Sequence, residues 1–305
     1  MKTFVISLGL SVIGLVTSAT AQIAKYDESV PAPTHSGIRY GKHERNELDF
    51  WKVESSKPTA LVFVIHGGGW RGGDSSKISR FIEVKKLLKQ GISVCSIHYR
   101  LIGKTQPFET PPVKAPLMDA ARALQFVRAN AKKWNIDKDR VYAVGGSAGA
   151  CSSLWLTLHD NMAKPDSKDP VERESTKFNG AAVKGPQTTL DPKQMKEWMS
   201  NSRYGGHAFG VPKFADFLAS RDKLMPLILK YSPYHQASKD DPEIYLSFSD
   251  KPKMGGAPKD PTHSVNFGIG LQKRYKELGL KCLVEYPGAN TGFATITDYL
   301  LAKLK

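Results

Sequence analysis

The sequence predicts an α/β protein with a mostly parallel central sheet and helices on both of its faces. Runs that are apolar throughout, such as TALVFVIHGGGW and ISVCSIHY, fit strands buried on both sides, as in parallel sheets. These runs alternate with segments of helical periodicity, which indicates βαβ units. The 305 residues are enough to bury a large core.

Strands and helices are expected to alternate along most of the chain. The helical segments place apolar residues three or four positions apart, and Gly91 ends the first of them. The expected strands are NELDFWKVE, TALVFVIHGGGW, ISVCSIHY, RVYAVGG, EIYLSFS and KCLVEY. The expected helices are KISRFIEVKKLLKQ, LMDAARALQFVRANAKKW, GACSSLWLTLH, SVNFGIGLQKRYKELG and TITDYLLAKL.

Residues 160–232 interrupt this alternation. They are polar, contain methionines and aromatic residues, and suggest short helical pieces with a small strand near NGAAVKG. We interpret them as a helical cap inserted over the sheet, within a main domain of residues 46–305. Aromatic side chains of the cap could line an apolar pocket or form the cap's own core. They are Trp198, Tyr204, Phe209, Phe214 and Phe217.

The N-terminal residues 1–21 have the pattern of a signal peptide. Lys2 precedes the apolar stretch FVISLGLSVIGLV, and TSATAQ supplies an A-x-A cleavage site that ends at Ala21. This stretch is shorter than the about 20 apolar residues of a membrane-spanning helix. We therefore expect a periplasmic or secreted protein, without stable membrane insertion after cleavage, that begins with a lead-in arm at residues 22–45.

The composition limits the partners. The formal net charge is +15, but no basic run is interleaved with aromatic residues, so we expect no nucleic-acid partner. Most of this charge fits a solvated surface, and the alternative is attraction to acidic polymers or envelope surfaces. The three cysteines lie in apolar stretches, which favours buried free thiols. No metal-ligand spacing occurs, so no metal or organic cofactor is expected.

The stretch VYAVGGSAGACSS carries the strongest chemical signal. It contains a G-x-S-x-G motif around Ser147, placed after an expected strand and before an expected helix. A serine on such a sharp turn has a strained backbone, and glycines at Gly145 and Gly149 avoid collisions with the neighbouring elements. The N-terminus of the following helix favours negative charge near the serine. Ser147 is therefore the expected nucleophile.

A second glycine motif, HGGGW at residues 66–70, also follows an expected strand. Backbone N–H groups can reach the oxyanion of a tetrahedral intermediate only where side chains do not intervene. We expect the amides of Gly68, Gly69 and Ala148 to form this oxyanion hole. His66 is expected to be structural. A phosphate-binding loop is disfavoured, because the glycine spacings typical of such loops are absent.

Together, these motifs resemble those of α/β-hydrolase fold carboxylesterases with an HGGGW loop, including feruloyl- and acetyl-esterase-like and hormone-sensitive-lipase-like groups. The resemblance implies a triad in the order Ser, Asp or Glu, His. It places the acid at Asp260, because DPTHSVNFGIGLQKRYKELG is similar to the family's acid-bearing loop and helix. Asp250, just after the strand EIYLSFS, remains the alternative. Either carboxylate could instead serve only in a turn or a helix cap.

The base is the open question. The family histidine follows the last strand in a PGAxHGF-like loop, whereas this chain reads PGANTGF, with Asn290 and Thr291. Threonine cannot accept and return a proton near neutral pH. Among the eight histidines, only His263 follows the acid-bearing strand, and His207 in the cap is the next candidate.

Two functions are therefore considered. The first is an exported serine ester hydrolase that uses His263 as its base and cleaves small or carbohydrate-linked acyl esters through an acyl-enzyme. The second is a homologue without a base that binds acylated ligands with little or no turnover. We expect the first, because both glycine motifs and the serine are present. A purely structural or partner-binding role would use only the cap and the basic surface.

Overall fold

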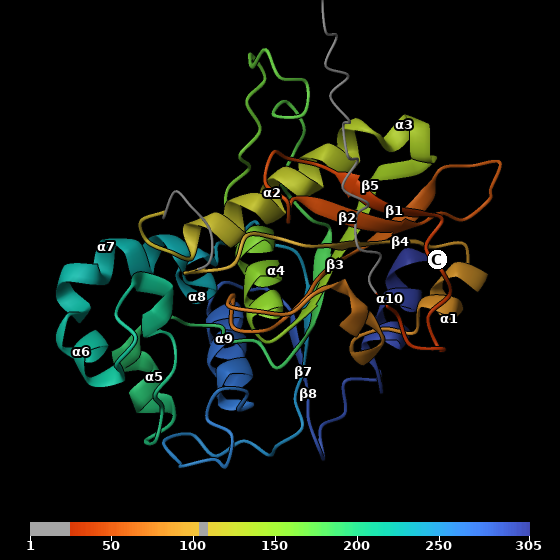
Figure 1. Cartoon of the computed structure of the whole chain (residues 1–305). Helices are drawn as coiled ribbons and strands as arrows, with labels where there is room; N and C mark the ends of the chain where they lie inside the picture. The colour runs from red at the N-terminus through yellow and green to blue at the C-terminus, as the bar shows by residue number, and fades with distance from the viewer. Residues whose placement is uncertain (1–24, 104–108) are drawn as a thin grey trace, which may run out of the picture.

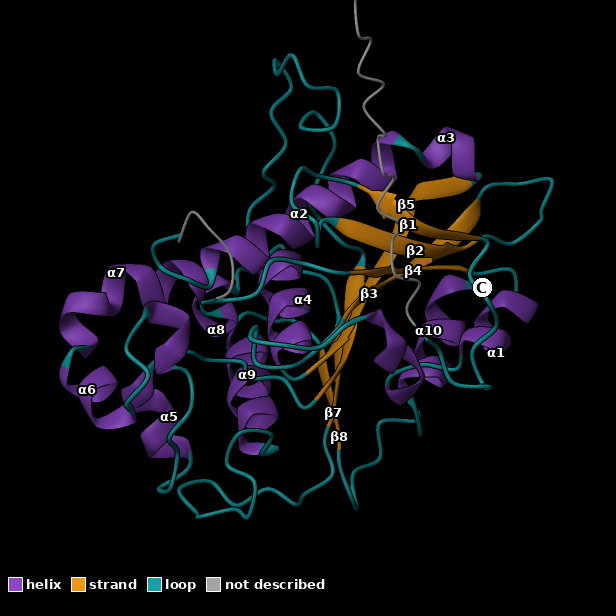
Figure 2. Ribbon diagram, viewed as in Figure 1, coloured by secondary structure: helices purple, strands orange, loops and turns teal. Residues whose placement is uncertain are grey.

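The computed structural model describes residues 25–103 and 109–305. Eight strands form one sheet in the order β1-β2-β4-β3-β5-β6-β7-β8, with helices on both faces (Figures 1 and 2). β2 is antiparallel to β1 and β4, and every other pair is parallel. The predicted fold class is thus confirmed. The strands are β1 (His35–Arg39), β2 (Glu47–Trp51), β3 (Thr59–Ile65), β4 (Ser93–Ile97), β5 (Ile136–Gly146), β6 (Gly180–Lys184), β7 (Ile244–Ser247) and β8 (Cys282–Glu285).

The helices form two layers around the sheet. α2, α4 and α9 cover one face, and α1 and α10 cover the other (Figure 1). The helices are η1 (Ser75–Arg80), α1 (Val84–Lys89), α2 (Lys114–Ala129), α3 (Ala131–Trp134), α4 (Ala148–Leu158), α5 (Pro192–Trp198), η2 (Gly206–Phe209), α6 (Phe214–Ala219), α7 (Arg221–Tyr231), α8 (Pro233–Gln236), α9 (Asn266–Glu277) and α10 (Ile296–Leu304). The segment KISRFIEVKKLLKQ, expected as one helix, divides into η1 and α1.

The central strand β3 shows why its sequence is apolar without interruption. All its residues are buried; Phe63 packs into the core on the α2–α4–α9 side, and Val62 and Val64 pack on the α1–α10 side. Burying a side chain of this size stabilises the fold by about 1.5–3 kcal/mol relative to leaving it exposed. β3 therefore ends at the C-terminal edge of the sheet as a rigid support for the HGGGW loop.

The structure corrects the predicted cap. Within residues 160–232, β6 is a member of the central sheet, paired in parallel with both β5 and β7. The helical insertion is limited to α5–α8 and lies outside α9 (Figure 1). β6 is short and its neighbours are polar, so its central position depends on sheet pairing rather than on its own sequence. The ends of two insertion helices are joined by Asp191, at the start of α5, whose carboxylate accepts 2.7 Å hydrogen bonds from Nε and Nη2 of Arg221, at the start of α7.

The predicted lead-in arm is also corrected. β1 lies within residues 22–45 and pairs with β2, so the arm includes the edge strand of the sheet. Upstream of β1, the Tyr26 hydroxyl donates to the carboxylate of Asp49 and lies 2.8 Å from Ser75 Oγ. The predicted signal peptide lies outside the described residues. Among the residues that are described, no helix has the length and apolar character needed to cross a bilayer.

The cysteines follow the prediction made from their apolar neighbours. All three thiols are buried and free. They are Cys95, Cys151 and Cys282.

Candidate active site

The turn between β5 and α4 carries Ser147 in a backbone conformation that few non-glycine residues adopt. Its φ is 53° and its ψ is −124°, a region that costs of order 1–3 kcal/mol. The neighbouring glycines leave room for this turn. A Cβ on Gly149 would lie 2.1 Å from the carbonyl oxygen of Ile65, and a Cβ on Gly145 would lie 2.6 Å from the Gly149 backbone. The two glycines of the G-x-S-x-G motif are therefore required by the packing of β3 against α4.

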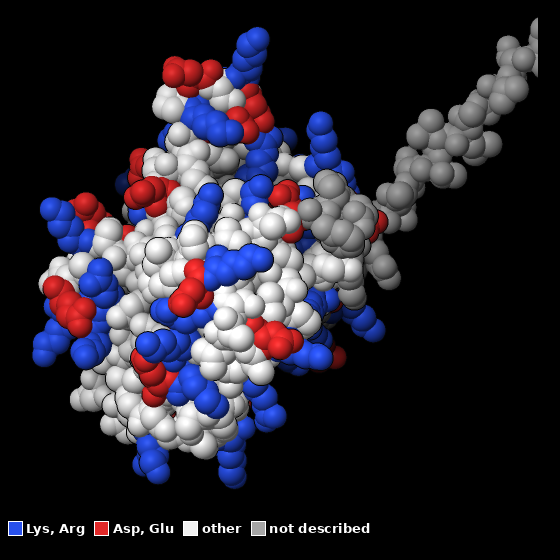
Figure 3. All heavy atoms as spheres, turned by 90° about the vertical axis from the view of Figure 1, so that its left-hand side faces the viewer, with Lys and Arg blue, Asp and Glu red and all other residues white. Residues whose placement is uncertain are grey.

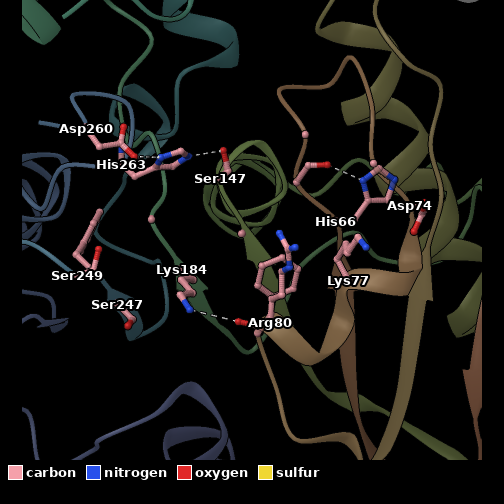
Figure 4. Close-up of a pocket in the computed structure, with 17 residues that line it drawn as sticks. His66, Asp74, Lys77, Arg80, Ser147, Lys184, Ser247, Ser249, Asp260 and His263 are labelled. Atoms are coloured by element: carbon pink, nitrogen blue, oxygen red, sulfur yellow. Dashed lines mark hydrogen bonds and ion pairs between the residues drawn. The ribbon is translucent and has the colours of Figure 1, made fainter. Parts of the chain in front are cut away.

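Ser147, His263 and Asp260 form a continuous hydrogen-bonded line (Figure 4). Ser147 Oγ lies 2.9 Å from His263 Nε2, and His263 Nδ1 lies 2.7 Å from Asp260 Oδ2. Because the Asp260 carboxylate accepts a hydrogen bond from the Nδ1–H of His263, the lone pair of Nε2 faces the serine hydroxyl. The structure thus brings together the three residues that the sequence suggested as nucleophile, base and acid.

The acid and the base lie on one loop, residues 248–265, between β7 and α9. Asp260 Oδ1 accepts the backbone N–H groups of Thr262 at 3.0 Å and of His263 at 3.3 Å. Burial raises the pKa of Asp260, but the hydrogen bond and charge of His263 and these backbone donors outweigh it, so the pKa is lowered. The pair is open to solvent: the Asp260 side chain is 62% exposed and that of His263 is 40% exposed. Water therefore weakens their electrostatic coupling.

The structure places Asp250, the alternative acid, at the start of α9. Its carboxylate accepts hydrogen bonds from Ser264 Oγ at 3.0 Å and from the backbone N–H of Val265 at 2.8 Å. The turn just before His263 is held by Gln187, which follows β6: its Nε2 donates to the carbonyl of Thr262 at 2.6 Å. Asp250 and Gln187 thus hold the two ends of the segment that carries His263, whereas of the two candidate acids only Asp260 contacts the imidazole.

The loop after β8, where the family histidine was expected, does not contribute to this site. Thr291 Oγ1 donates to the carboxylate of Glu285 and lies 3.2 Å from the carbonyl oxygen of Phe293. Neither Asn290 nor Thr291 lines the pocket at Ser147. The loop after β8 therefore does not place a side chain of either residue in the pocket of the serine.

His66 holds the HGGGW loop and is not placed as a base. Its ring is buried, stacks on Tyr99 with centroids 4.2 Å apart, and donates from Nδ1 to the carbonyl of Gly67 at 2.8 Å. Nε2 faces an Arg45 guanidinium nitrogen at 3.3 Å. Burial lowers the pKa of His66 to about 3, so the ring is neutral near pH 7. This agrees with the structural role expected for it.

Two of the three residues whose amides are expected to form the oxyanion hole, Gly68 and Ala148, lie beside the serine. Gly68 lines the pocket that contains Ser147, and Gly68 and Gly69 have positive φ of 112° and 61°. Ala148 is the first residue of α4. Within the described part of the chain, no acceptor forms a hydrogen bond with the N–H of any of the three. Within the described residues, these three N–H groups are thus available to a bound ligand.

His207, the other candidate base, supports the same loop from the cap. Its Nε2 lies 3.1 Å from the carbonyl oxygen of Gly69, and its ring contacts Trp70 and Tyr204. Burial is the main reason why the pKa of His207 is lowered to about 4. It therefore fixes the backbone of the HGGGW loop and does not contact Ser147.

The pocket at Ser147 has a volume of about 490 Å³. Its apolar walls include Phe81 and Phe248. None of the cap aromatics suggested by the sequence lines it. Of these, Phe209 stacks on Phe217 inside the cap, and Trp198 packs against Phe267 of α9. They therefore belong to the core of the cap and to its contact with α9. In residues 25–103 and 109–305, no cluster of His, Cys, Asp or Glu could hold a metal ion.

Sequence reasoning missed Lys184 because β6 was assigned to the cap. The carbonyl of Lys184 accepts the Ser147 N–H at 3.0 Å, and its side chain enters the pocket. Lys77 and Arg80 of η1 also line this pocket (Figure 4). No motif signals these three cations, since they meet only when β6 and η1 are placed beside the serine turn.

The chain is similar to known esterases over part of its length. The family model described as BD-FAE matches residues 48–254. Gut esterase 1 of Caenorhabditis elegans is 32% identical over 154 residues, which cover 49% of this chain and 27% of that protein. The acetylxylan esterase of Xylanibacter ruminicola is 28% identical over 184 residues, 56% of this chain and 36% of that protein. The chain thus matches only about a quarter to a third of these curated relatives.

Solved structures share the fold at low sequence identity. A truncated carbohydrate esterase from gut microbiota has a TM-score of 0.64 at 18% identity, covering 86% of this chain and 89% of that one. Esterase 2 of Thermogutta terrifontis has a TM-score of 0.63 at 18% identity, covering 87% and 84%. The eight-stranded architecture is therefore that of solved esterases.

Proposed function

The chain belongs to the BD-FAE family of α/β-hydrolase esterases, and on this basis we propose that it is a carboxylic ester hydrolase that forms an acyl-enzyme at Ser147. The observation that carries the proposal is the line of hydrogen bonds from Ser147 through His263 to Asp260. It supplies a nucleophile, a base and an acid in the geometry that acyl transfer requires.

In the acylation step, Ser147 Oγ attacks the carbonyl carbon of the ester while His263 Nε2 takes the hydroxyl proton. The carbonyl oxygen becomes negatively charged and accepts hydrogen bonds from the amides of Gly68, Gly69 and Ala148. His263 then gives the proton to the leaving alkoxide, the C–O bond breaks, and the alcohol departs. Asp260 stabilises the imidazolium that exists in between.

In the deacylation step, water takes the place of the alcohol. His263 accepts a proton from the water, whose oxygen attacks the acyl carbon of the Ser147 ester. The second tetrahedral intermediate collapses, the proton returns from His263 to Ser147 Oγ, and the carboxylic acid leaves. The sum of the two steps is ester plus water giving alcohol plus acid, with the enzyme restored.

The alternative of a homologue without a base has no support from the site. It rested on Thr291 at the usual histidine position. A histidine at 2.9 Å from the serine hydroxyl, supplied from the loop before α9, fulfils the same requirement. We therefore retain only the hydrolase.

The substrate we propose is a small or carbohydrate-linked acyl ester. The pocket is about 490 Å³ and contains the apolar Phe81 and Phe248, which suits a short acyl group. An acetylxylan esterase among the relatives supports a carbohydrate ester. The signal-peptide pattern at residues 1–21 supports action outside the cytoplasm, in the periplasm or as a secreted protein.

The test is hydrolysis of p-nitrophenyl acetate by the purified protein together with labelling by a fluorophosphonate. Wild-type protein is expected to turn over the ester and to carry the label on Ser147. Ser147→Ala should lose both properties. Ser249→Ala is the matched control, because Ser249 lines the same pocket but is not a hydrogen-bond partner of the His263 ring, whose partners are Asp260 and Ser147. Labelling at another residue, or equal turnover by Ser147→Ala, contradicts the proposal.

A further inference from the structure

A second pocket continues from the one at Ser147. Its volume is about 460 Å³, and it shares Ser249, Asp260 and His263 with the first pocket. The loop between β7 and α9 forms its walls, from Ser249 to Asn266. The acid–base pair therefore lines two adjoining pockets, of which the first contains the nucleophile and the second does not.

Both pockets are lined by cations. Lys77, Arg80 and Lys184 line the first, and Lys251, Lys253 and Lys259 line the second. All six side chains belong to exposed residues. None forms a salt bridge with a carboxylate of the described chain. Among the described residues, Lys184 Nζ forms a hydrogen bond only with the carbonyl oxygen of Arg80, at 3.4 Å.

The carboxylates of the two pockets are already used. They are Asp74, Asp250 and Asp260. Asp74 caps η1 by accepting the N–H of Ser76, Asp250 holds the start of α9, and Asp260 holds His263. Six cations thus face three carboxylates that are committed to the protein itself. The region around the acid–base pair carries an excess of positive charge.

What distinguishes these cations from other unpaired lysines is their position around two adjoining pockets at the acid–base pair. On the face that includes the helical insertion, Lys and Arg are dispersed and interspersed with acidic residues (Figure 3). Some lysines elsewhere pair with carboxylates, as Lys86 does with Asp298 at 2.9 Å and Lys303 with Glu243 at 2.9 Å. Cations without ion pairs line both pockets. Their positive potential raises the local concentration of anionic ligands, because the low-dielectric walls of a cleft focus the electric field.

We propose that the two pockets bind an acylated acidic polysaccharide. The acyl group enters the first pocket at Ser147, and anionic groups of the chain, carboxylates or sulfates, contact the cations of both pockets. This inference rests on the proposed ester hydrolysis and names the class of alcohol that leaves. Two adjoining pockets of about 490 and 460 Å³ provide more room than a short acyl group fills.

The test compares acetyl release from four polymers at low and high salt. They are acetylated polygalacturonate, the same polymer after reduction of its carboxyl groups, an acetylated sulfated galactan, and its desulfated form. Wild-type kcat/KM is expected to be about tenfold higher on an anionic polymer than on its neutral partner in 20 mM NaCl, and the ratio should fall toward one in about 0.5 M NaCl. The uronate and sulfate pairs identify which anion is recognised.

Variants locate the effect. The triple change Lys251→Gln, Lys253→Gln and Lys259→Gln should reduce the anionic-to-neutral ratio several-fold. The matched control is Lys57→Gln, Lys132→Gln and Lys133→Gln, three exposed lysines near the start of β3 and β5, at the opposite end of the sheet; it should leave the ratio unchanged. Ser147→Ala should still bind the favoured polymer, and double-stranded DNA should not compete.

The two proposals fail in different ways. Absence of p-nitrophenyl acetate turnover by wild-type protein contradicts ester hydrolysis itself. Turnover of that ester with ratios near one for both polymer pairs contradicts the acidic-polysaccharide inference alone. The acidic-polysaccharide inference is also overturned if the control triple variant lowers the anionic-to-neutral ratio of kcat/KM as much, or if DNA competes effectively. In either case the effect of charge would be unspecific.

Discussion

Replacing Asp260 with asparagine tests the placement of the acid on the same loop as the base. At the 2.7 Å separation of Asp260 Oδ2 and His263 Nδ1, Coulomb's law gives about 1.5 kcal/mol at the dielectric constant of water and about 6 kcal/mol at an effective value of 20. Because the Asp260 side chain is 62% exposed, the coupling belongs toward the lower value. Taking about 2–3 kcal/mol, loss of the charge lowers kcat by roughly 30- to 150-fold.

The hydrogen-bond pattern adds a second cost to Asp260→Asn. Oδ1 accepts the backbone N–H groups of Thr262 and His263, so the amide oxygen of the asparagine takes that place. Its NH₂ group then faces His263 Nδ1 and donates to it. The proton moves to Nε2, which can no longer accept from Ser147. The total loss in kcat is expected to be about 10³-fold, below the about 10⁴-fold that a wrong tautomer costs at a buried triad.

The assay is steady-state hydrolysis of p-nitrophenyl acetate, with folding checked by thermal unfolding. Asp250→Asn is the control, since Asp250 contacts Ser264 and Val265 but not the imidazole. Asp250→Asn should lower the melting temperature but leave kcat close to the wild-type value. The reasoning is refuted if Asp260→Asn keeps wild-type kcat, or if folded Asp250→Asn loses as much activity as Asp260→Asn.

Three further predictions follow from the same structure. His263→Ala should lower kcat/KM by about 10²–10⁴-fold, and adding Thr291→His should not restore it, because residue 291 does not line the pocket; rescue by the double variant would contradict the site. Gly149→Ala should abolish the folded protein or strongly lower its melting temperature, because the new Cβ would lie 2.1 Å from the Ile65 carbonyl oxygen; a wild-type melting temperature would be the opposing result. Burial lowers the pKa of His207 from 6.5 to about 4, so the unfolded chain binds more protons between these values, and stability falls as pH drops through this range, by about 3 kcal/mol. Urea unfolding of His207→Gln from pH 7 to pH 4 should show a weaker dependence than wild type, and an unchanged slope would refute the assignment.

Local sequence determined the parts of the molecule whose cause is local. Uninterrupted apolar runs can be buried on both faces only in a covered sheet, so the fold class could be predicted before any contact was known. Ser147 could be singled out because the turn geometry depends on its glycine neighbours. Asp260 and His263 could be paired as candidates because they are three residues apart on one loop.

Tertiary structure decided what depends on contacts between distant segments. Ser147 and His263 are 116 positions apart, and only the packing of β5 beside β6 and β7 brings the imidazole to the hydroxyl. Short segments such as β1 and β6 have too little apolar sequence to reveal their places, because pairing with longer strands stabilises them. The cations around the pocket come from η1, β6 and the loop after β7, so no linear pattern contains them. Sequence periodicity reports which side of an element is buried, whereas the site depends on which elements are neighbours.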